Sequence, residues 1–156
     1  MKKLTMILSL LLMITVCPAF ADDKEDAIQF FNDYVKAANT YNPVITTLYS
    51  PNAKIIRQVV KPDGTTANAY TDTATYIKQM KLGQAGAKLR RYTNTYTNIT
   101  AEKVANGYKV SSLRQPSGED YKLKTYMIVT KQPDGKWLIT EEMMQTKVQA
   151  LLKYAE

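Results

Sequence analysis

The chain beyond residue 21 begins with the hydrophobic period of a helix. Apolar residues recur at spacings of three and four and so share one face: Ile28, Phe31, Tyr34, Val35 and Ala38. Pro43 ends this helix and suits the first turn of a second, short one that reaches about Ser50. We therefore predict two consecutive helices at the start of the folded part of the chain.

The pattern then changes to that of β-strands. The segment 53–61 is rich in β-branched residues, and a Pro-Asp-Gly turn precedes a short return strand over about 65–70. Asp72 is placed to cap a third helix, for which Gly83 is the expected end. The remaining segments predict four strands joined by tight turns, one of them Asn106-Gly107, and a short amphipathic tail: 89–103, 108–115, 121–131, 136–146 and 148–152.

Helices followed by a run of strands are typical of the α+β class. The sequence contains no internal repeat, linker or low-complexity segment. We therefore expect residues 22–156 to form a single domain, in which N-terminal helices cover one face of a curved antiparallel sheet.

Residues 1–21 predict an export signal. Lys2 and Lys3 precede an apolar run over 4–16, which is shorter than the roughly 20 residues needed to span a bilayer. Ala19-Phe20-Ala21 has the small-x-small form of a cleavage site, and Cys17 lacks the neighbours of a lipid-attachment site. We expect cleavage after Ala21 and a periplasmic or secreted protein with no stable membrane anchor.

Composition excludes several kinds of chemistry. The 156 residues contain no histidine and one cysteine, which excludes imidazole catalysis, internal disulfides and Cys/His metal sites. Loss of residues 1–21 lowers the formal charge from +7 to +5, because only Lys2 and Lys3 are charged there. Such thinly spread charge does not indicate a nucleic-acid partner. No metal or cofactor is predicted.

Two stretches resemble the nuclear-transport-factor-2-like superfamily. The run from Tyr34 to Ala53 resembles the superfamily's long helix and its short helix, which ends in a Leu-Tyr/Phe-x-x-x-Ala segment. The late run Pro-Asp-Gly-Lys-Trp137-Leu-Ile is similar to its usual ending. The resemblance implies a cone of helices and curved sheet. Such cones serve ketosteroid isomerases, dehydratases, epoxide hydrolases and polyketide cyclases, and also non-catalytic binding and assembly domains.

The resemblance also implies where an isomerase-type site would lie. Its tyrosine matches Tyr34, whereas its catalytic carboxylate falls on Arg57 and its second acid near Met127. Arginine cannot act as a general base at neutral pH, and methionine has no proton to donate. We therefore expect no ketosteroid isomerisation and treat these three residues as candidates for lining a ligand pocket.

Glu141 and Glu142 are the carboxylates without an obvious place at a turn or helix start. Adjacent side chains of a regular strand face opposite sides of the sheet, so one of the two points toward the helices. Which one depends on register. A buried glutamate needs a partner, and Arg57 is the candidate. The inward glutamate either lines a ligand pocket or forms a structural ion pair, and we favour the ion pair.

Two sheet surfaces are candidates for contact with other molecules. Tyr92, Asn94, Tyr96 and Asn98 occupy alternate positions, a stripe that suits a polar ligand, a solvated face or a subunit interface. In 121–131 the face opposite the core carries Tyr126 and Ile128 among lysines. Members of the superfamily often dimerise through this outer face. We therefore expect a homodimer with Tyr126 and Ile128 at its interface.

Three functional classes remain open. The favoured one is an exported, non-catalytic domain that binds a small molecule or a protein partner in or around the cone. The first alternative is a cone-fold enzyme, a lyase, isomerase or hydrolase with an atypical site. The second is a dimeric accessory domain of an envelope complex. The enzymatic alternative is disfavoured, because such a site needs a convergent acid and base and the sequence does not offer two carboxylates that lack a structural role.

Overall fold

The computed structural model describes residues 20–155, with side chains described from Asp23 onward. The elements in chain order are α1 (Phe20–Asn39), the short 3₁₀ helix η1 (Pro43–Thr47), β1 (Tyr49–Val60), β2 (Thr66–Thr71), α2 (Thr73–Leu89), β3 (Asn94–Val104), β4 (Gly107–Pro116), β5 (Leu123–Lys131), β6 (Trp137–Thr146) and the 3₁₀ helix η2 (Gln149–Tyr154). Residues 1–19 of the expected export signal lie outside the described part. No helix within residues 20–155 is long and apolar enough to cross a bilayer.

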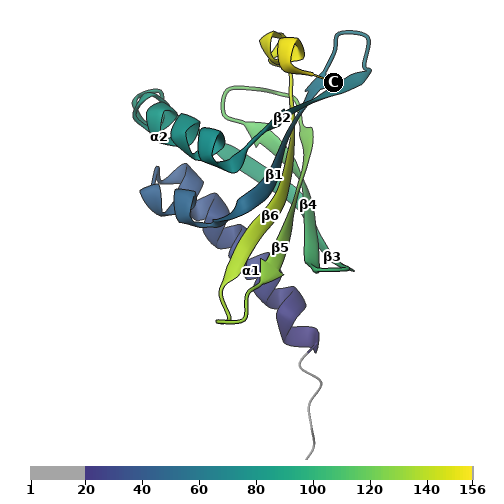
Figure 1. Cartoon of the computed structure of the whole chain (residues 1–156). Helices are drawn as coiled ribbons and strands as arrows, with labels where there is room; N and C mark the ends of the chain where they lie inside the picture. The colour runs from purple at the N-terminus through teal and green to yellow at the C-terminus, as the bar shows by residue number, and fades with distance from the viewer. Residues whose placement is uncertain (1–19, 156) are drawn as a thin grey trace, which may run out of the picture.

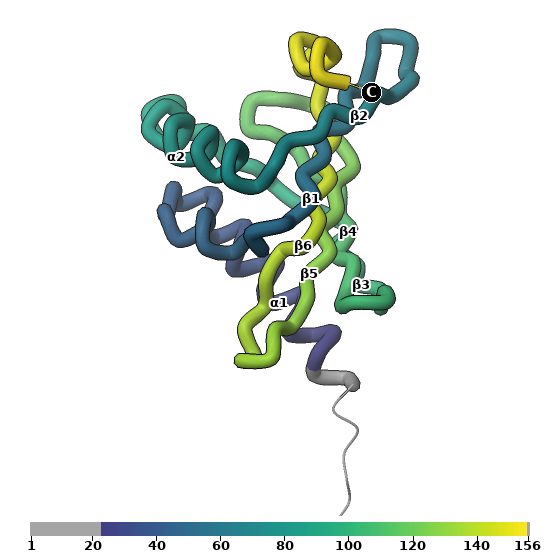
Figure 2. Tube along the Cα trace, viewed as in Figure 1, coloured from purple at the N-terminus to yellow at the C-terminus, as the bar shows by residue number. Residues whose placement is uncertain are grey.

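The expected α+β architecture is confirmed. The strands form one sheet in the order β2-β1-β6-β5-β4-β3, and both long helices lie on the same side of it (Figure 1). Helix α1 packs against β3 and β4, whereas α2 packs against β1. The chain trace shows the sheet curving around the helices (Figure 2). The hydrophobic core fills the space between these layers.

The sheet departs from a fully antiparallel arrangement at one pair of strands. β1 and β6 are parallel, while the other four neighbouring pairs are antiparallel. Parallel neighbours need a long crossover connection, and here the whole chain from β2 to β5 supplies it. The last strand therefore lies in the middle of the sheet, between β1 and β5.

The predicted turns are confirmed, and one of them requires glycine. Asn106-Gly107 joins β3 to β4, where Gly107 has a φ of 142°. A Cβ atom at Gly107 would collide with the main-chain carbonyl of Val129 on β5. Glycine therefore allows both the positive φ at this position and the close approach of β5 to the turn.

Three predicted boundaries are wrong. Helix α2 continues past Gly83 to Leu89 and ends where Arg91 takes a positive φ of 51°. Gly83 does not adopt that conformation, and the alanines that follow it favour helix. Strand β1 begins at Tyr49, earlier than predicted, and β3 begins at Asn94, later than predicted.

Candidate functional site

A buried carboxylate, that of Glu142, lies at the centre of the cone. Glu142 is on β6 and is 0% exposed to solvent. Its Oε1 accepts hydrogen bonds from Arg57 Nη2 at 2.8 Å and from the Tyr76 hydroxyl at 3.3 Å. Its Oε2 accepts from the hydroxyls of Tyr49 at 2.5 Å and Tyr34 at 3.3 Å. Two donors on each oxygen fill the acceptor positions of a carboxylate.

The four donors come from four different parts of the chain. Tyr34 lies on the inward face of α1, as the helical spacing predicts, and Tyr49 is the first residue of β1. Arg57 follows on β1, so that its side chain points to the same side of the sheet as Glu142. Tyr76 lies in the first turn of α2. The carboxylate therefore fastens both long helices and the first strand to the middle of the sheet.

The cluster is arranged so that its charges are balanced. Burial works against the charge of Arg57, but Tyr76 and Glu142 outweigh burial and hold the pKa of the guanidinium above its ordinary value. The guanidinium also lies over the Tyr76 ring, 4.6 Å from its centre. Burial, followed by the nearby Glu142 charge, raises the pKa of Tyr34 and Tyr49 well above 10. Burial likewise raises the pKa of Tyr76, to about 12.

These contacts limit what Glu142 can do chemically. A general base must reach the proton that it removes, and it must have a free acceptor position to receive it. Glu142 has neither solvent exposure nor an acceptor position without a donor. The arrangement is that of a structural ion pair with three supporting hydroxyls.

A cavity of about 570 Å³ lies beside this cluster, between β2, the start of α2 and η2. Arg57 and Tyr76 form its inner end and so belong both to the cluster and to the cavity wall. Further hydrogen-bonding groups and an aromatic ring complete the wall: Asp72, Thr75, Gln79 and Tyr154. Tyr70 also borders the cavity, but its ring lies on the outer face of the sheet beside Lys54. The Asp72 carboxylate caps α2 by accepting from the Thr75 main-chain N–H at 2.9 Å, which places its charge at the positive end of the helix.

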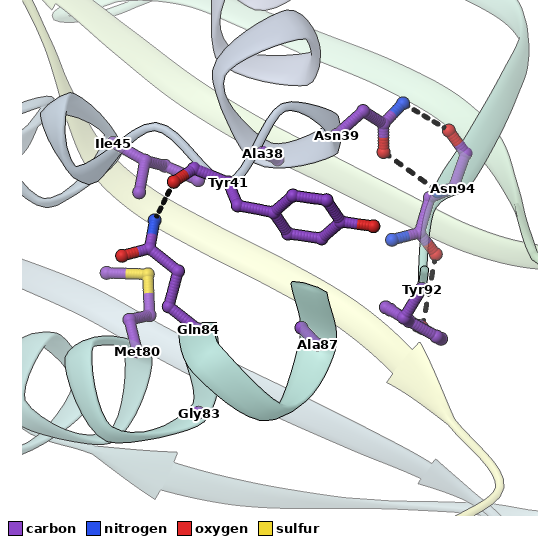
Figure 3. Close-up of a pocket in the computed structure, with 10 residues that line it drawn as sticks. All are labelled: Ala38, Asn39, Tyr41, Ile45, Met80, Gly83, Gln84, Ala87, Tyr92 and Asn94. Carbon is purple, nitrogen blue, oxygen red and sulfur yellow. Dashed lines mark hydrogen bonds between the residues drawn. The ribbon is translucent and has the colours of Figure 1, made fainter. Parts of the chain in front are cut away.

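A second, smaller cavity of about 220 Å³ lies between the end of α1, α2 and the start of β3 (Figure 3). Its body is apolar, with Ala38, Ile45, Met80 and Ala87 in the wall. Asn94 and Tyr92 give it a polar end. The Asn39 side chain holds that end in place, since it exchanges two hydrogen bonds of 2.9 Å with the main chain of Asn94.

The comparisons with known proteins bear on the fold. The sequence matches no protein-family model and no curated protein. Among solved structures, a nuclear-transport-factor-2-like protein of unknown function from Pseudomonas putida has a TM-score of 0.63 at 10% identity, covering 80% of this chain and 87% of that one. Nuclear transport factor 2 from Cryptosporidium parvum has a TM-score of 0.55 at 15% identity, covering 85% and 98%. The chain has the nuclear-transport-factor-2-like cone fold.

A candidate ketosteroid isomerase from Shewanella frigidimarina shares this cone fold as well, with a TM-score of 0.55 at 19% identity and coverage of 74% of this chain and 91% of that one. At such identities the likeness concerns the fold alone. What this cone binds or catalyses depends on its own side chains.

The cone brings together three of the residues singled out in the sequence. Tyr34, Arg57 and Glu142 meet, and the pairing of Arg57 with the inward glutamate is confirmed. Glu141 faces the other side of the sheet, where it accepts a hydrogen bond of 2.6 Å from the Tyr126 hydroxyl. Met127 is 2% exposed and packs in the core, directly opposite Glu142 on the neighbouring strand.

Sequence reasoning missed two members of the cluster. Neither Tyr76, which lies in the predicted third helix, nor Tyr49 was assigned to any site. A buried acid needs several donors, and tyrosines on inward faces are the side chains able to supply them. That requirement is the signal that could have pointed to Tyr76. Tyr49 had no such signal, because the segment around it was interpreted as the end of a helix.

The outer face of the cone carries the two interface candidates. Tyr126 and Ile128 are half-buried, and the Lys109 ammonium lies 4.6 Å from the centre of the Tyr126 ring. Ile128 lies opposite Lys109 on one side and Glu141 on the other.

The proposed tyrosine and asparagine stripe on β3 is interrupted. Asn98 has a positive φ of 55°, and the pairing register shifts between Thr97 and Thr100. Tyr92 precedes the strand. The regular alternation is therefore limited to Asn94 and Tyr96.

Proposed function

We propose that this cone-fold protein is an exported, non-catalytic domain that binds a small polar molecule in the cavity beside Arg57. The observation that carries the proposal is the state of Glu142. It is the one buried carboxylate among residues 23–155, and all of its acceptor positions are committed to Arg57 and three tyrosines. The cavity beside it, in contrast, presents hydrogen-bonding groups to whatever enters.

The wall of that cavity favours an uncharged ligand. The charge of Arg57 is compensated by Glu142, and that of Asp72 by the start of α2. The remaining polar groups are hydroxyls and an amide, placed beside the rings of Tyr76 and Tyr154. Neutral donors and acceptors beside aromatic rings suit a molecule with both polar edges and apolar faces. A volume of about 570 Å³ accommodates a sugar or a molecule of similar size.

The proposal is tested by filling the cavity with a side chain. Native mass spectrometry of protein recovered from the envelope fraction is expected to show a bound small molecule on a chain that begins at Asp22. Thr75→Trp should remove this added mass, because residue 75 lines the cavity. Ala74→Trp is the matched control, since Ala74 is the exposed neighbouring residue on the same helix turn and is not part of the cavity wall.

Two outcomes would contradict this proposal. One is a wild-type spectrum that shows only the bare chain under conditions gentle enough to retain bound ligands. The other is equal loss of the ligand in both tryptophan variants, which would place the effect outside the cavity. A chain that still begins at Met1 would contradict export alone.

The outer sheet face supports a second proposal, that the protein forms a homodimer as an accessory domain. Tyr70 is 43% exposed on β2, and Tyr126 and Ile128 are half-buried on β5. Ile56 and Met143 lie between Tyr70 and Tyr126 in the strand register and connect them into one apolar band. A contiguous apolar band on the outer face of a sheet is typical of an interaction surface.

Ile128→Lys should convert such a dimer into a folded monomer. In a two-fold interface one added charge appears twice, and each copy must be desolvated. Within the protomer the new lysine lies between Glu141 and Lys109, so it gains one opposite charge and one like charge as neighbours, and the variant is expected to fold. Sedimentation equilibrium at tens of micromolar, roughly where a weak interface still associates, measures the mass. Thr95→Lys, at an exposed position on the edge strand, should leave the dimer intact. A wild type that sediments as a monomer would refute the dimer.

A further inference from the structure

The second cavity ends close to a buried arginine that has no acidic partner. Arg114 on β4 is 7% exposed, and it makes no ion pair with any of the described residues. Its Nη1 donates to Asn94 Oδ1 at 2.8 Å and to the Tyr92 hydroxyl at 3.3 Å, and its Nη2 donates to the Gln145 carbonyl at 2.9 Å. Its Nε is buried with no partner among the same residues. Buried charges are usually paired, so this cation is unusual.

Arg114 fixes the direction in which the Asn94 amide points. A guanidinium offers only donors, so Asn94 must turn its oxygen toward Arg114. The amide nitrogen of Asn94 then faces the cavity, where its N–H groups can meet a ligand. Figure 3 shows this nitrogen on the cavity side, with the Tyr41 hydroxyl directed toward Asn94. The end of the cavity thus presents a donor, with a positive charge behind it.

The rest of the cavity fits an apolar group. Ala38, Ile45, Met80 and Ala87 provide its walls, and about 220 Å³ is enough for a short aliphatic chain or a single ring. The solvent-exposed end of α2 adds Lys88, Arg90 and Arg91 nearby in the chain, and there is no acidic residue between Thr73 and Arg91. Such a positive surface raises the local concentration of anions.

From this arrangement we infer that the second cavity binds a small monocarboxylate with an apolar body. The carboxylate accepts a hydrogen bond from the Asn94 amide and compensates the charge of Arg114, while the body lies among the apolar side chains. A neutral molecule of the same shape gains the apolar contacts but leaves the arginine uncompensated. This site is separate from the cavity beside Arg57 and does not depend on it.

Isothermal titration calorimetry with octanoate and with benzoate tests the inference. At least one of the two carboxylates is expected to bind with a stoichiometry of one. Its uncharged counterpart, 1-octanol or benzyl alcohol, should bind at least about tenfold more weakly, because a hydrogen bond to a charged group is worth that much or more.

Asn94→Asp separates the role of charge from that of shape. The new carboxylate has nearly the same shape as the Asn94 amide and pairs with Arg114. It therefore compensates the positive charge that a bound carboxylate would otherwise compensate. Carboxylate affinity should fall at least about tenfold, while the thermal midpoint of the free protein stays the same or rises. Ala87→Phe should also abolish binding by filling the cavity, whereas Ala85→Phe, at an exposed position on the same helix, should not.

Several results would overturn the inference. They are the absence of binding by both carboxylates, equal affinity for the alcohols, or unchanged carboxylate affinity in either Asn94→Asp or Ala87→Phe. Should Asn94→Asp fail to fold, the pair of phenylalanine variants still decides. Because Thr75→Trp blocks the other cavity, carboxylate binding that persists in that variant assigns the site to the second cavity.

Discussion

Glu142→Leu is expected to lower the free energy of unfolding by about 3–5 kcal/mol, the range for breaking a buried ion pair by removing one partner. The leucine fills the space but accepts no hydrogen bonds. Arg57 loses its only ion-pair partner among the described residues. The hydroxyls of Tyr34 and Tyr49 lose their hydrogen-bond acceptor while they remain buried. Guanidinium chloride unfolding followed by circular dichroism measures the change.

Glu141→Leu is the matched control for this substitution. Glu141 is the same residue type at the adjacent position, but it is half-buried on the other face and accepts one hydrogen bond, from Tyr126. Its loss should cost about 1 kcal/mol. Equal effects of the two leucine variants would show that the inner cluster does not stabilise the fold as described.

A combined variant tests why Glu142→Leu is costly. Adding Arg57→Met to Glu142→Leu removes the unpaired cation and should recover part of the lost stability. Recovery should remain incomplete, because three tyrosine hydroxyls still lack their acceptor. Further addition of Tyr49→Phe should recover more, and a double variant no better than Glu142→Leu alone would contradict this account.

The same cluster should make the protein unusually sensitive to alkaline pH. The folded state raises the pKa of Tyr34, Tyr49 and Tyr76 above the ordinary value of 10. Between pH 10 and the folded pKa, the unfolded chain releases tyrosine protons that the folded protein retains. Stability is therefore fully present below pH 10 and falls as pH rises. From about pH 9 to pH 11 the three residues together should reduce it by up to roughly 4 kcal/mol.

Denaturant unfolding at a series of alkaline pH values measures this loss, and tyrosine ionisation can be followed in parallel by ultraviolet absorbance. Tyr76→Phe should make the decline with pH shallower, because one of the three shifted hydroxyls is removed. Tyr154→Phe, at a position 60% exposed, should leave the slope as it was. A wild type equally stable at pH 8 and pH 11 would contradict the prediction.

The sequence predicts those parts of the fold that depend on local chemistry. The inward face of α1, the Asp72 cap of α2 and the Asn106-Gly107 turn are each determined by a few neighbouring residues, and all three are present. The pairing of Arg57 with a glutamate of β6 could also be predicted, because a buried acid requires a partner and the sequence offers few basic residues at inward positions. The sequence could not show that the inward glutamate is Glu142, since this depends on the register of β6.

Features that depend on distant contacts were not predictable. Tyr49 is separated from Glu142 by 93 residues, and the local pattern around it is that of a helix end. The length of α2 was underestimated because Gly83 is a common helix terminator, although here it is an ordinary helical residue. The lack of an acidic partner for Arg114 cannot be predicted from hydrophobic periodicity, because the alternation along β4 indicates only that Arg114 faces the helices.

The central position of β6 has a consequence for the order in which the protein can fold. During synthesis, the β1–β2 hairpin and the β3–β5 meander are complete before any residue of β6 exists, yet they share no strand pairing with one another. Only the last long strand joins them, and Arg57 meets its partner across a separation of 85 residues. Contacts this distant in sequence slow folding, because a long loop must close before they form. Completion of the single sheet therefore waits for its final strand, and until then we expect the β1–β2 hairpin and the β3–β5 meander to remain two separate sheet fragments.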